Sequence, residues 1–176
     1  MTDYSLKTAL RLRESKIEEI EQYQLKLLRK HFCHAATAPY YKQLFKDNNI
    51  RPEELSSLKD LQNIPLTTRQ VLDEHGDRFQ TVPDDKIVDL ALTSGTTGSP
   101  VKVPYTKNDL KRLAFNETMA FWGAGIRPDD NCQIAVTLDR CFIAGLAYYN
   151  GLVQLGAKTI RSGPGQPARG HRDPGG

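Results

Sequence analysis

The sequence predicts an α/β protein, with an N-terminal helical segment followed by the first part of a mixed, mostly parallel β-sheet flanked by helices. Between residues 17 and 35, apolar residues recur at steps of three and four, which is typical of an amphipathic helix. From residue 87 onward, short apolar runs alternate with helical stretches. Such alternation favours right-handed crossovers and parallel strands. We expect a helical segment over 1–85, a sheet region over 86–162 and a disordered tail over 163–176.

The helical segment is predicted to begin with one long amphipathic helix, from about residue 6 to residue 38. Its polar face carries Glu, Lys, Arg and Gln side chains. Pro39 is expected to end this helix, because the residue before a proline avoids the helical conformation. The apolar positions that define its buried face are Ile17, Ile20, Tyr23, Leu27, Leu28, Phe32 and Ala35.

A string of short helices is predicted between residues 40 and 83. Pro52 is expected in the first turn of one of them. Thr67 is expected to cap another, with its hydroxyl binding a free amide while Gln70 reaches back to complete a capping box. The predicted buried side of this stretch consists of Leu55, Leu58, Leu61 and Ile64.

The sheet region is predicted to contain short strands joined by loops and helices. The expected order is a strand over 87–92, a loop over 93–100, a strand over 101–105, a helix over 106–123, a strand over 134–138, a helix over 143–155 and a strand over 157–160. Thr106 is predicted to cap the first of these helices, with Asp109 completing a capping box. Gly123 and Gly125 are expected to end that helix.

Composition and charge exclude several classes of partner. The formal net charge is only +3, and the charged residues are scattered, so no basic stripe predicts binding to nucleic acid. No apolar run approaches the length of a membrane span, and the first residues lack a secretory signal pattern. The three cysteines, Cys33, Cys132 and Cys141, form no CxxC pair, which favours reduced thiols. We therefore expect a cytoplasmic protein without a membrane or nucleic-acid partner.

The most informative feature is the loop over residues 93–100, which is rich in hydroxyl side chains and contains two glycines. Glycine lacks a Cβ, so the main-chain amides of such a loop can approach an anion closely. The loop is not a Walker-type phosphate loop, because Pro100 stands where that pattern requires its second glycine. From composition alone, a plain turn and a phosphate cradle both remain open readings.

The loop and its flanks resemble the adenylate-forming superfamily, which includes acyl-CoA synthetases and luciferases. The loop reads Thr93-Ser94-Gly95-Thr96-Thr97-Gly98-Ser99-Pro100 and is similar to the phosphate-binding signature of that superfamily. The flanks resemble the phenylacetate-CoA ligase branch in type and order, over about residues 19–163. The flanking matches are Ala38-Pro39-Tyr40-Tyr41, Leu58-Lys59-Asp60-Leu61, Ile64-Pro65-Leu66-Thr67-Thr68-Arg69, Val103-Pro104-Tyr105-Thr106 and Leu155-Gly156-Ala157-Lys158.

The resemblance implies an AMP-forming acyl- or aryl-CoA ligase that uses ATP, Mg²⁺ and coenzyme A. In this reaction a small-molecule carboxylate attacks the α-phosphate of ATP, and coenzyme A then displaces AMP from the acyl adenylate. The resemblance implies that the loop holds the departing β- and γ-phosphates. The implied phosphate-binding residues are Ser94, Gly95, Thr96, Thr97 and Gly98. No residue of this chain is assigned as a catalytic residue or as a metal ligand, because the lysine that the family uses lies in its C-terminal domain.

The sequence departs from the family pattern in two respects. Ser99 stands where the family commonly has a basic residue, and Lys102 lies three residues later. The adenine-closing motif, the ribose-binding aspartate and the C-terminal lysine of the family do not occur here. We therefore expect an N-terminal part of the adenylating domain that is inactive alone and self-associates through an unpaired sheet edge. The abrupt change of composition at residue 163 suggests a gene fragment or a frame slip. A non-catalytic remnant or interaction module without nucleotide turnover is the alternative reading.

The sequence gives weaker evidence for a functional role of the other histidine, cysteine and aromatic residues. His31 and His34 lie at a spacing found in metal sites, but the sequence offers no second ligand cluster, so an exposed helix face is favoured. The cysteines have no evident base partner, which argues against a nucleophile. Residues 139–145 match a family region that lines the acyl or coenzyme A pocket. Phe142 and Tyr148 are the candidate apolar walls there, and a plain turn followed by a core helix remains an equal alternative.

Overall fold

A computed structural model describes residues 4–93, 100–139 and 141–165, and its mixed α/β architecture confirms the predicted class. The chain divides into two compact units. A helical unit is centred on residues 7–87, and a sheet unit comprises mainly residues 88–93 and 103–165. The predicted domain limits at 85 and 162 stay predictions. Within the described residues, no helix is long and apolar enough to cross a membrane.

The helical unit contains more helix breaks than the sequence pattern predicted. Its elements are α1 (Leu6–Arg13), α2 (Ile17–Ala35), α3 (Pro39–Asp47), η1 (Pro52–Glu54), η2 (Leu58–Asn63), α4 (Arg69–His75), η3 (Gly76–Phe79) and η4 (Asp84–Lys86). The single helix predicted over 6–38 is wrong, because the chain turns between α1 and α2. The Ser15 hydroxyl donates to the carbonyl oxygen of Arg11 at 3.2 Å, and Lys16 is extended, so the backbone leaves the helix there.

Two predicted helix boundaries also shift in this unit. Pro39 begins α3 instead of ending the preceding helix, because proline suits the first helical turn and Ala38 before it is extended. Thr68, not Thr67, caps α4 and accepts a hydrogen bond from the Val71 amide. The Thr67 hydroxyl lies 3.0 Å from the Tyr41 hydroxyl instead. The predictions that Pro52 opens a helical turn and that Leu55 is buried are confirmed.

Aromatic rings form the centre of the helical unit. Phe45 is buried, and its ring centroid lies 5.7 Å from the ring centroids of both Phe32 and Tyr41. Tyr40 stacks on Phe79 at 4.2 Å, which joins α3 to η3. Leu61 was predicted to be buried, but 42% of its surface is exposed, because the six-residue η2 turn presents it to solvent.

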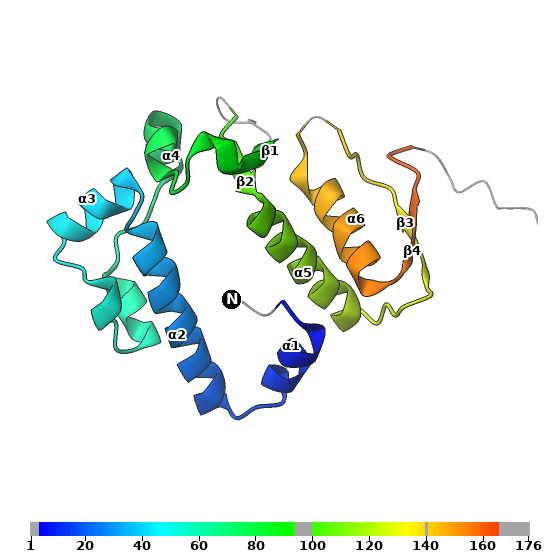
Figure 1. Cartoon of the computed structure of the whole chain (residues 1–176), viewed down its shortest axis with the longest axis horizontal. Helices are drawn as coiled ribbons and strands as arrows, with labels where there is room; N and C mark the ends of the chain where they lie inside the picture. Colours follow the sequence, from blue (N-terminus) through cyan, green and yellow to red (C-terminus); the bar gives the residue numbers. More distant parts are fainter. Residues whose placement is uncertain (1–3, 94–99, 140, 166–176) are drawn as a thin grey trace, which may run out of the picture. The chain divides into compact units, whose positions relative to one another are not determined.

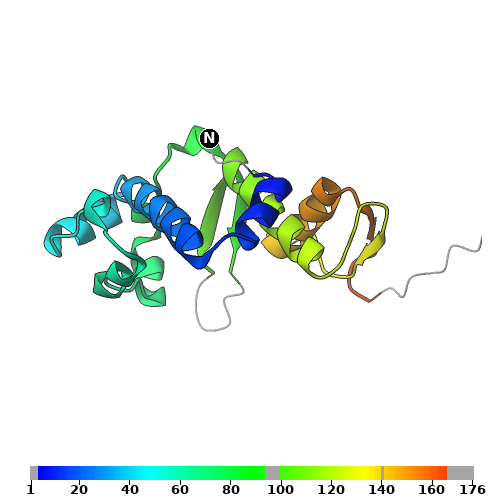
Figure 2. The same ribbon diagram turned by 90° about the horizontal axis from the view of Figure 1, so that it is seen from below.

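The sheet unit contains two separate two-stranded sheets in the described residues instead of one continuous sheet. Its elements are β1 (Ile87–Leu92), β2 (Lys102–Thr106), α5 (Lys107–Gly123), β3 (Asn131–Ile134), α6 (Ile143–Leu155) and β4 (Lys158–Arg161). β1 is adjacent to β2, as Figure 2 shows, and β3 pairs with β4. The β3–β4 pair is parallel, with Asn131 opposite Lys158 and Ile134 opposite Arg161. A helix joins these parallel strands, as the alternating pattern predicted.

The helix α6 packs between α5 and the β3–β4 pair (Figure 1). Ile134 on β3, Leu152 on α6 and Ala157 before β4 form the buried core of this unit. At the α5–α6 contact, the Thr118 hydroxyl lies within hydrogen-bond distance of the carbonyl oxygens of Ala114 and Gly151. A Cβ at Gly151 would collide with the Cβ of Glu117, so only glycine allows the two helices this close an approach.

The ends predicted for α5 are confirmed, whereas the limits predicted for the strand β3 are wrong. Thr106 and Asp109 form the predicted capping box, and α5 ends at Gly123 with Gly125 in the left-handed region at φ +98°. The strand predicted over 134–138 instead covers Asn131–Ile134. After Ile134 the chain forms local bonds in place of a ladder, because the Thr137 hydroxyl donates to the Asp139 carboxylate.

Candidate functional site

The five residues predicted to bind phosphate lie outside the described residues, and so the phosphate role assigned to them stays a prediction. They are Ser94, Gly95, Thr96, Thr97 and Gly98. The structure nevertheless places both ends of this loop. β1 ends at Leu92, directly before Thr93, and β2 begins at the exposed Lys102. Because β1 and β2 are adjacent, the loop connects two neighbouring strands, as the sequence predicted.

The end of β1 is tied to the segment that precedes α6. The Leu92 amide donates a hydrogen bond to the carbonyl oxygen of Cys141 at 3.2 Å. The Phe142 amide donates to the carbonyl oxygen of Asp139 at 3.1 Å, and Cys141 adopts a left-handed backbone conformation with φ +57°. The described residues on both sides of position 140, namely 137–139 and 141–142, therefore form a turn, which one main-chain bond fixes to the strand leading into the predicted phosphate loop.

A close approach at Gly145 fixes the same turn to α6. A Cβ at this position would collide with the carbonyl oxygen of Thr137 and lie 3.0 Å from a methyl carbon of Leu138. Gly145 is buried, and no larger residue fits without moving the turn. Sequence reasoning placed Gly145 at the limit of a family pocket region but gave it no role. A glycine inside a predicted helix was the available signal.

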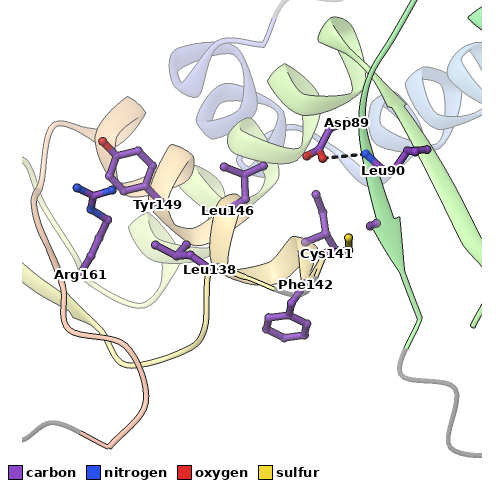
Figure 3. A pocket seen from close by; sticks show the side chains of 10 residues that line it. Asp89, Leu90, Leu138, Cys141, Phe142, Leu146, Tyr149 and Arg161 are labelled. Carbon is purple, nitrogen blue, oxygen red and sulfur yellow. Dashed lines mark hydrogen bonds between the residues drawn. The ribbon is translucent and has the colours of Figure 1, made fainter.

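A pocket of about 430 Å³ lies between the end of β1, this turn and α6 (Figure 3). Its walls are mostly apolar, and Figure 3 shows Leu138, Leu146 and Phe142 among them. The volume falls within the usual range of small-ligand sites, about 300–1,000 Å³. The lining residues are Asp89, Leu90, Ala91, Leu138, Cys141, Phe142, Ile143, Leu146, Tyr149 and Arg161.

Two charged side chains stand at the margins of this pocket. The Arg161 guanidinium carbon lies 5.2 Å from the ring centroid of Tyr149, in cation–π range. The Asp89 carboxylate accepts a hydrogen bond from the Leu90 amide at 2.8 Å. Figure 3 shows Arg161 and Asp89 on opposite sides of the apolar centre. Sequence reasoning missed Asp89, Tyr149 and Arg161, since only the fold brings β1, α6 and β4 together.

Burial and nearby carboxylates raise the pKa values of two side chains on the strands. Burial raises the pKa of the Tyr105 phenol on β2, and the carboxylates of Asp109 and Asp89 raise it further. Burial also raises the pKa of the Cys132 thiol on β3, with a contribution from Asp130. Both groups are therefore favoured in their neutral forms, and neither provides an activated nucleophile at neutral pH.

The other residues that the sequence singled out lie in different surroundings. Phe142 lines the 430 Å³ pocket, whereas Tyr148 does not, and the expectation that this pocket holds an acyl group or coenzyme A stays a prediction. Tyr148 packs on Phe121 of α5 with ring centroids 5.9 Å apart. His34 is exposed, and its Nε2 lies 3.0 Å from the Thr81 hydroxyl oxygen. Among the residues that the structure describes, no group of three or more His, Cys, Asp or Glu side chains could hold a metal ion.

The three thiols differ in their exposure to solvent. Cys33 and Cys141 are exposed, and Cys132 is half-buried. Cys141 opens onto the pocket, and the Asp139 carboxylate two residues earlier is engaged by the Thr137 hydroxyl.

Comparison with known proteins gives homologues of one kind. No family model matches the chain. A phenylacetate-coenzyme A ligase from Pseudomonas putida is 32% identical over 152 residues, which is 85% of this chain and 34% of that protein. A phenylacetate-coenzyme A ligase from Escherichia coli strain K12 is 32% identical over 153 residues, covering 85% of this chain and 35% of that protein.

The solved structures agree with the sequence relatives. A crystal structure of 2-hydroxyisobutyryl-CoA ligase, in complex with 2-HIB-AMP and CoA, matches with a TM-score of 0.77 and 26% identity. The match covers 87% of this chain and 34% of that one. The chain thus spans about a third of the length of the ligases to which it is similar. Phenylacetate-coenzyme A ligases are homologues of this chain, and its fold matches part of a CoA ligase.

Proposed function

We propose that this chain forms the phosphate-binding part of an AMP-forming acyl- or aryl-CoA ligase. The similarity to phenylacetate-coenzyme A ligases carries the proposal, since it extends over 85% of the chain at 32% identity. An alignment of 152 residues in a chain of 176 necessarily contains the loop over residues 93–100. The overall reaction converts a carboxylate, ATP and coenzyme A into an acyl-CoA, AMP and pyrophosphate.

The proposed role of the loop rests on the chemistry of its donors. Hydroxyls at Ser94, Thr96 and Thr97, with the amides around Gly95 and Gly98, offer hydrogen-bond donors to phosphate oxygens. Charge-assisted bonds of this kind are about twice as strong as neutral ones. The described residues contain no carboxylate-rich metal cluster, so we propose that Mg²⁺ arrives bound to ATP. The ion would neutralise the part of the phosphate charge that the hydrogen-bond donors of the loop leave uncompensated.

The proposed chemistry has two displacement steps. In the first, a carboxylate oxygen attacks the α-phosphorus of ATP, the bond to the β-phosphate breaks, and pyrophosphate leaves. In the second, the coenzyme A thiolate attacks the acyl carbonyl carbon, and AMP leaves. The loop would contribute mainly to the first step, because donors aimed at the leaving phosphates stabilise the charge that builds up there.

The 430 Å³ pocket is the proposed place for the apolar part of the acyl substrate. Leu138, Phe142 and Leu146 offer apolar and aromatic walls, and the turn that carries Phe142 is bonded to the end of β1. This connection would bring an acyl group near the phosphate loop. An aryl or arylacetic acid fits the apolar lining best, and ATP and coenzyme A are the remaining proposed partners, in the cytoplasm.

We further propose that the chain alone does not catalyse the ligase reaction. Its relatives are about three times as long, and adenylation needs groups on both sides of the reacting atoms held within about 1 Å. Alone, the edge of β3 that pairs with no strand among the described residues would support weak self-association at high concentration. A non-catalytic module without nucleotide binding is the alternative, and nucleotide titration separates the two.

The test is calorimetric titration of the full chain with MgATP. We expect saturable binding that Thr96→Ala or Thr97→Ala weakens about tenfold or more, because a hydrogen bond to a charged group contributes about 1.5–3 kcal/mol. Thr37→Ala is the matched control, since Thr37 is exposed at the end of α2 and bonds only locally to His34. Absence of saturable binding would favour the non-catalytic module. Binding that both loop variants leave unchanged would refute the loop assignment.

A further inference from the structure

The 430 Å³ pocket of the sheet unit carries one positive and one negative side chain across its apolar centre. Arg161 and Asp89 stand on opposite sides of that centre (Figure 3). They do not pair with each other, and within the described residues neither of them takes part in an ion pair. Because a few polar groups in an apolar pocket fix the orientation of its ligand, this pair favours a ligand with opposite charges at its two ends.

The Arg161 side chain is held by a contact that leaves its hydrogen-bond donors available. Its guanidinium carbon lies 5.2 Å from the ring centroid of Tyr149, which is half-buried on α6. A cation–π contact involves the charge of the guanidinium and does not consume its five N–H donors. Arg161 is also exposed, so a carboxylate can reach two of these donors from solvent and bind them side by side.

The Asp89 carboxylate is suited to a cation at the other side of the pocket. Asp89 is half-buried on β1, and one of its oxygens accepts a hydrogen bond from the Leu90 amide at 2.8 Å. An ionised carboxylate offers about four acceptor positions, so this bond leaves most of them open. Partial burial strengthens the attraction to a cation, because less water separates and screens the two charges.

We infer that the pocket binds an aromatic carboxylic acid that carries an amino group at the far end of its ring. The carboxylate binds Arg161, and the ammonium group binds Asp89. The ring lies among Leu138, Phe142 and Leu146. This assignment rests on the proposed function, since the same pocket is the proposed acyl site, and it narrows the substrate class. An acid without the amino group would cover the Asp89 carboxylate with carbon, and burying a charge without a partner is costly.

The experiment compares two acids of nearly identical shape, 4-(aminomethyl)phenylacetate and 4-ethylphenylacetate. The ammonium group of the first replaces a methyl group of the second, so only the charge at the far end differs. Each acid is titrated into the ¹⁵N-labelled full chain, and amide chemical shifts report both the affinity and the place of binding. We expect the amino acid derivative to bind about tenfold or more tightly, with shifts at 89–92 and 141–149.

Asp89→Asn tests the site of the ammonium group. Asparagine keeps the shape of the side chain and can still accept the hydrogen bond of the Leu90 amide, but it lacks the charge. We expect the two acids to bind this variant about equally, with the affinity for 4-ethylphenylacetate unchanged. Asp85→Asn is the matched control, because Asp85 is exposed in η4, pairs with Lys86 and does not line the pocket. It should keep the preference.

Arg161→Met tests the site of the carboxylate. Methionine keeps an unbranched apolar side chain beside Tyr149 but removes every N–H donor. We expect both acids to bind about tenfold or more weakly, because a charge-assisted contact that both of them use is lost. Lys158→Met is the matched control, since Lys158 is an exposed cation of the same strand that does not line the pocket.

The outcomes separate this assignment from the proposed function. Equal affinity for the two acids, a preference that survives Asp89→Asn, or shifts confined to residues outside the pocket would each overturn the assignment. Arg161→Met that weakens MgATP binding and leaves acid binding unchanged would give Arg161 to the nucleotide and overturn it too. The expected acid preference in a chain that does not bind MgATP would support the assignment and count against the proposed function.

Discussion

A single glycine, Gly151, sets the distance between α5 and α6. Its missing side chain allows the Thr118 hydroxyl to reach the carbonyl oxygen of Gly151 at 3.0 Å. A Cβ there would collide with Glu117 and lie 3.1 Å from the Thr118 amide nitrogen. The helices could accommodate alanine only by separating, and separation would loosen the packing around Leu152.

We predict that Gly151→Ala lowers the free energy of unfolding by about 1–3 kcal/mol, although alanine favours helix by about 1 kcal/mol over glycine. Gly123→Ala is the matched control, because a Cβ at Gly123 would meet nothing within 4 Å. That control is expected to be neutral or slightly stabilising. Urea denaturation of the two variants measures the difference. Equal stabilities would show that the α5–α6 approach is not tight at Gly151.

The residues of the candidate site were predictable only in part from the sequence. Phe142 was a candidate pocket wall because residues 139–145 resemble a pocket-lining region of the family, and its side chain lines the 430 Å³ pocket. For Tyr148 a pocket wall and a core position were equal alternatives, and it packs on Phe121 of α5 while its neighbour Tyr149 lines the pocket. The helix α6 is apolar on nearly all sides, so its periodicity does not show which side meets α5 and which meets the pocket. That assignment needs the position of α5, which the local pattern does not contain.

At the scale of elements, helix caps determine several boundaries in the helical unit. The Asp60 carboxylate in η2 accepts hydrogen bonds from the Ser56 amide at 2.6 Å and the Ser57 amide at 2.9 Å. The backbone bonds from Ser57 and Ser56 hold the pKa of Asp60 below its usual value. A lowered pKa means that folding favours the ionised carboxylate.

We predict that this cap contributes stability above the unfolded pKa of aspartate, about 4, and that the contribution is lost as the pH falls through the lower folded pKa. The unfolded chain binds the proton first, so acid favours unfolding. Asp60→Asn should therefore destabilise the protein at pH 7 and make progressively less difference below pH 4. Asp77→Asn, at an exposed aspartate outside the cap, is the control. Denaturation midpoints over this pH range give the comparison, and a constant Asp60→Asn difference would contradict the cap.

Element types were easier to predict than their limits. The capping box at Thr106 and the glycine stop gave the correct ends of α5, because both signals are local. The break between α1 and α2 was missed, since the apolar spacing continues on both sides of Ser15. β3 begins three residues before its predicted start because its pairing with β4, at Asn131 opposite Lys158, decides its limits. Such long-range pairing leaves no trace in the sequence of the strand itself.

At the scale of the whole molecule, the sequence predicted the mixed α/β class, and the resemblance gave the ligase relationship. It did not predict that β1–β2 and β3–β4 form separate sheets within the described residues. The chain spans about a third of the length of its relatives and matches part of a CoA ligase with a TM-score of 0.77. The active site that we propose would therefore be completed by the rest of a ligase fold.

We propose that the loop beginning at Thr93 binds the triphosphate of ATP during adenylation. The most direct test is phenylacetate-dependent exchange of labelled pyrophosphate into ATP, measured on a fusion of the full chain with the C-terminal two-thirds of the Pseudomonas putida ligase and on the chain alone. We predict exchange by the fusion, none by the chain alone, and a loss of about 100-fold or more when Thr96 and Thr97 are both changed to alanine, because transition-state donors carry effects of this size. A folded fusion whose exchange survives the double substitution would contradict the claim.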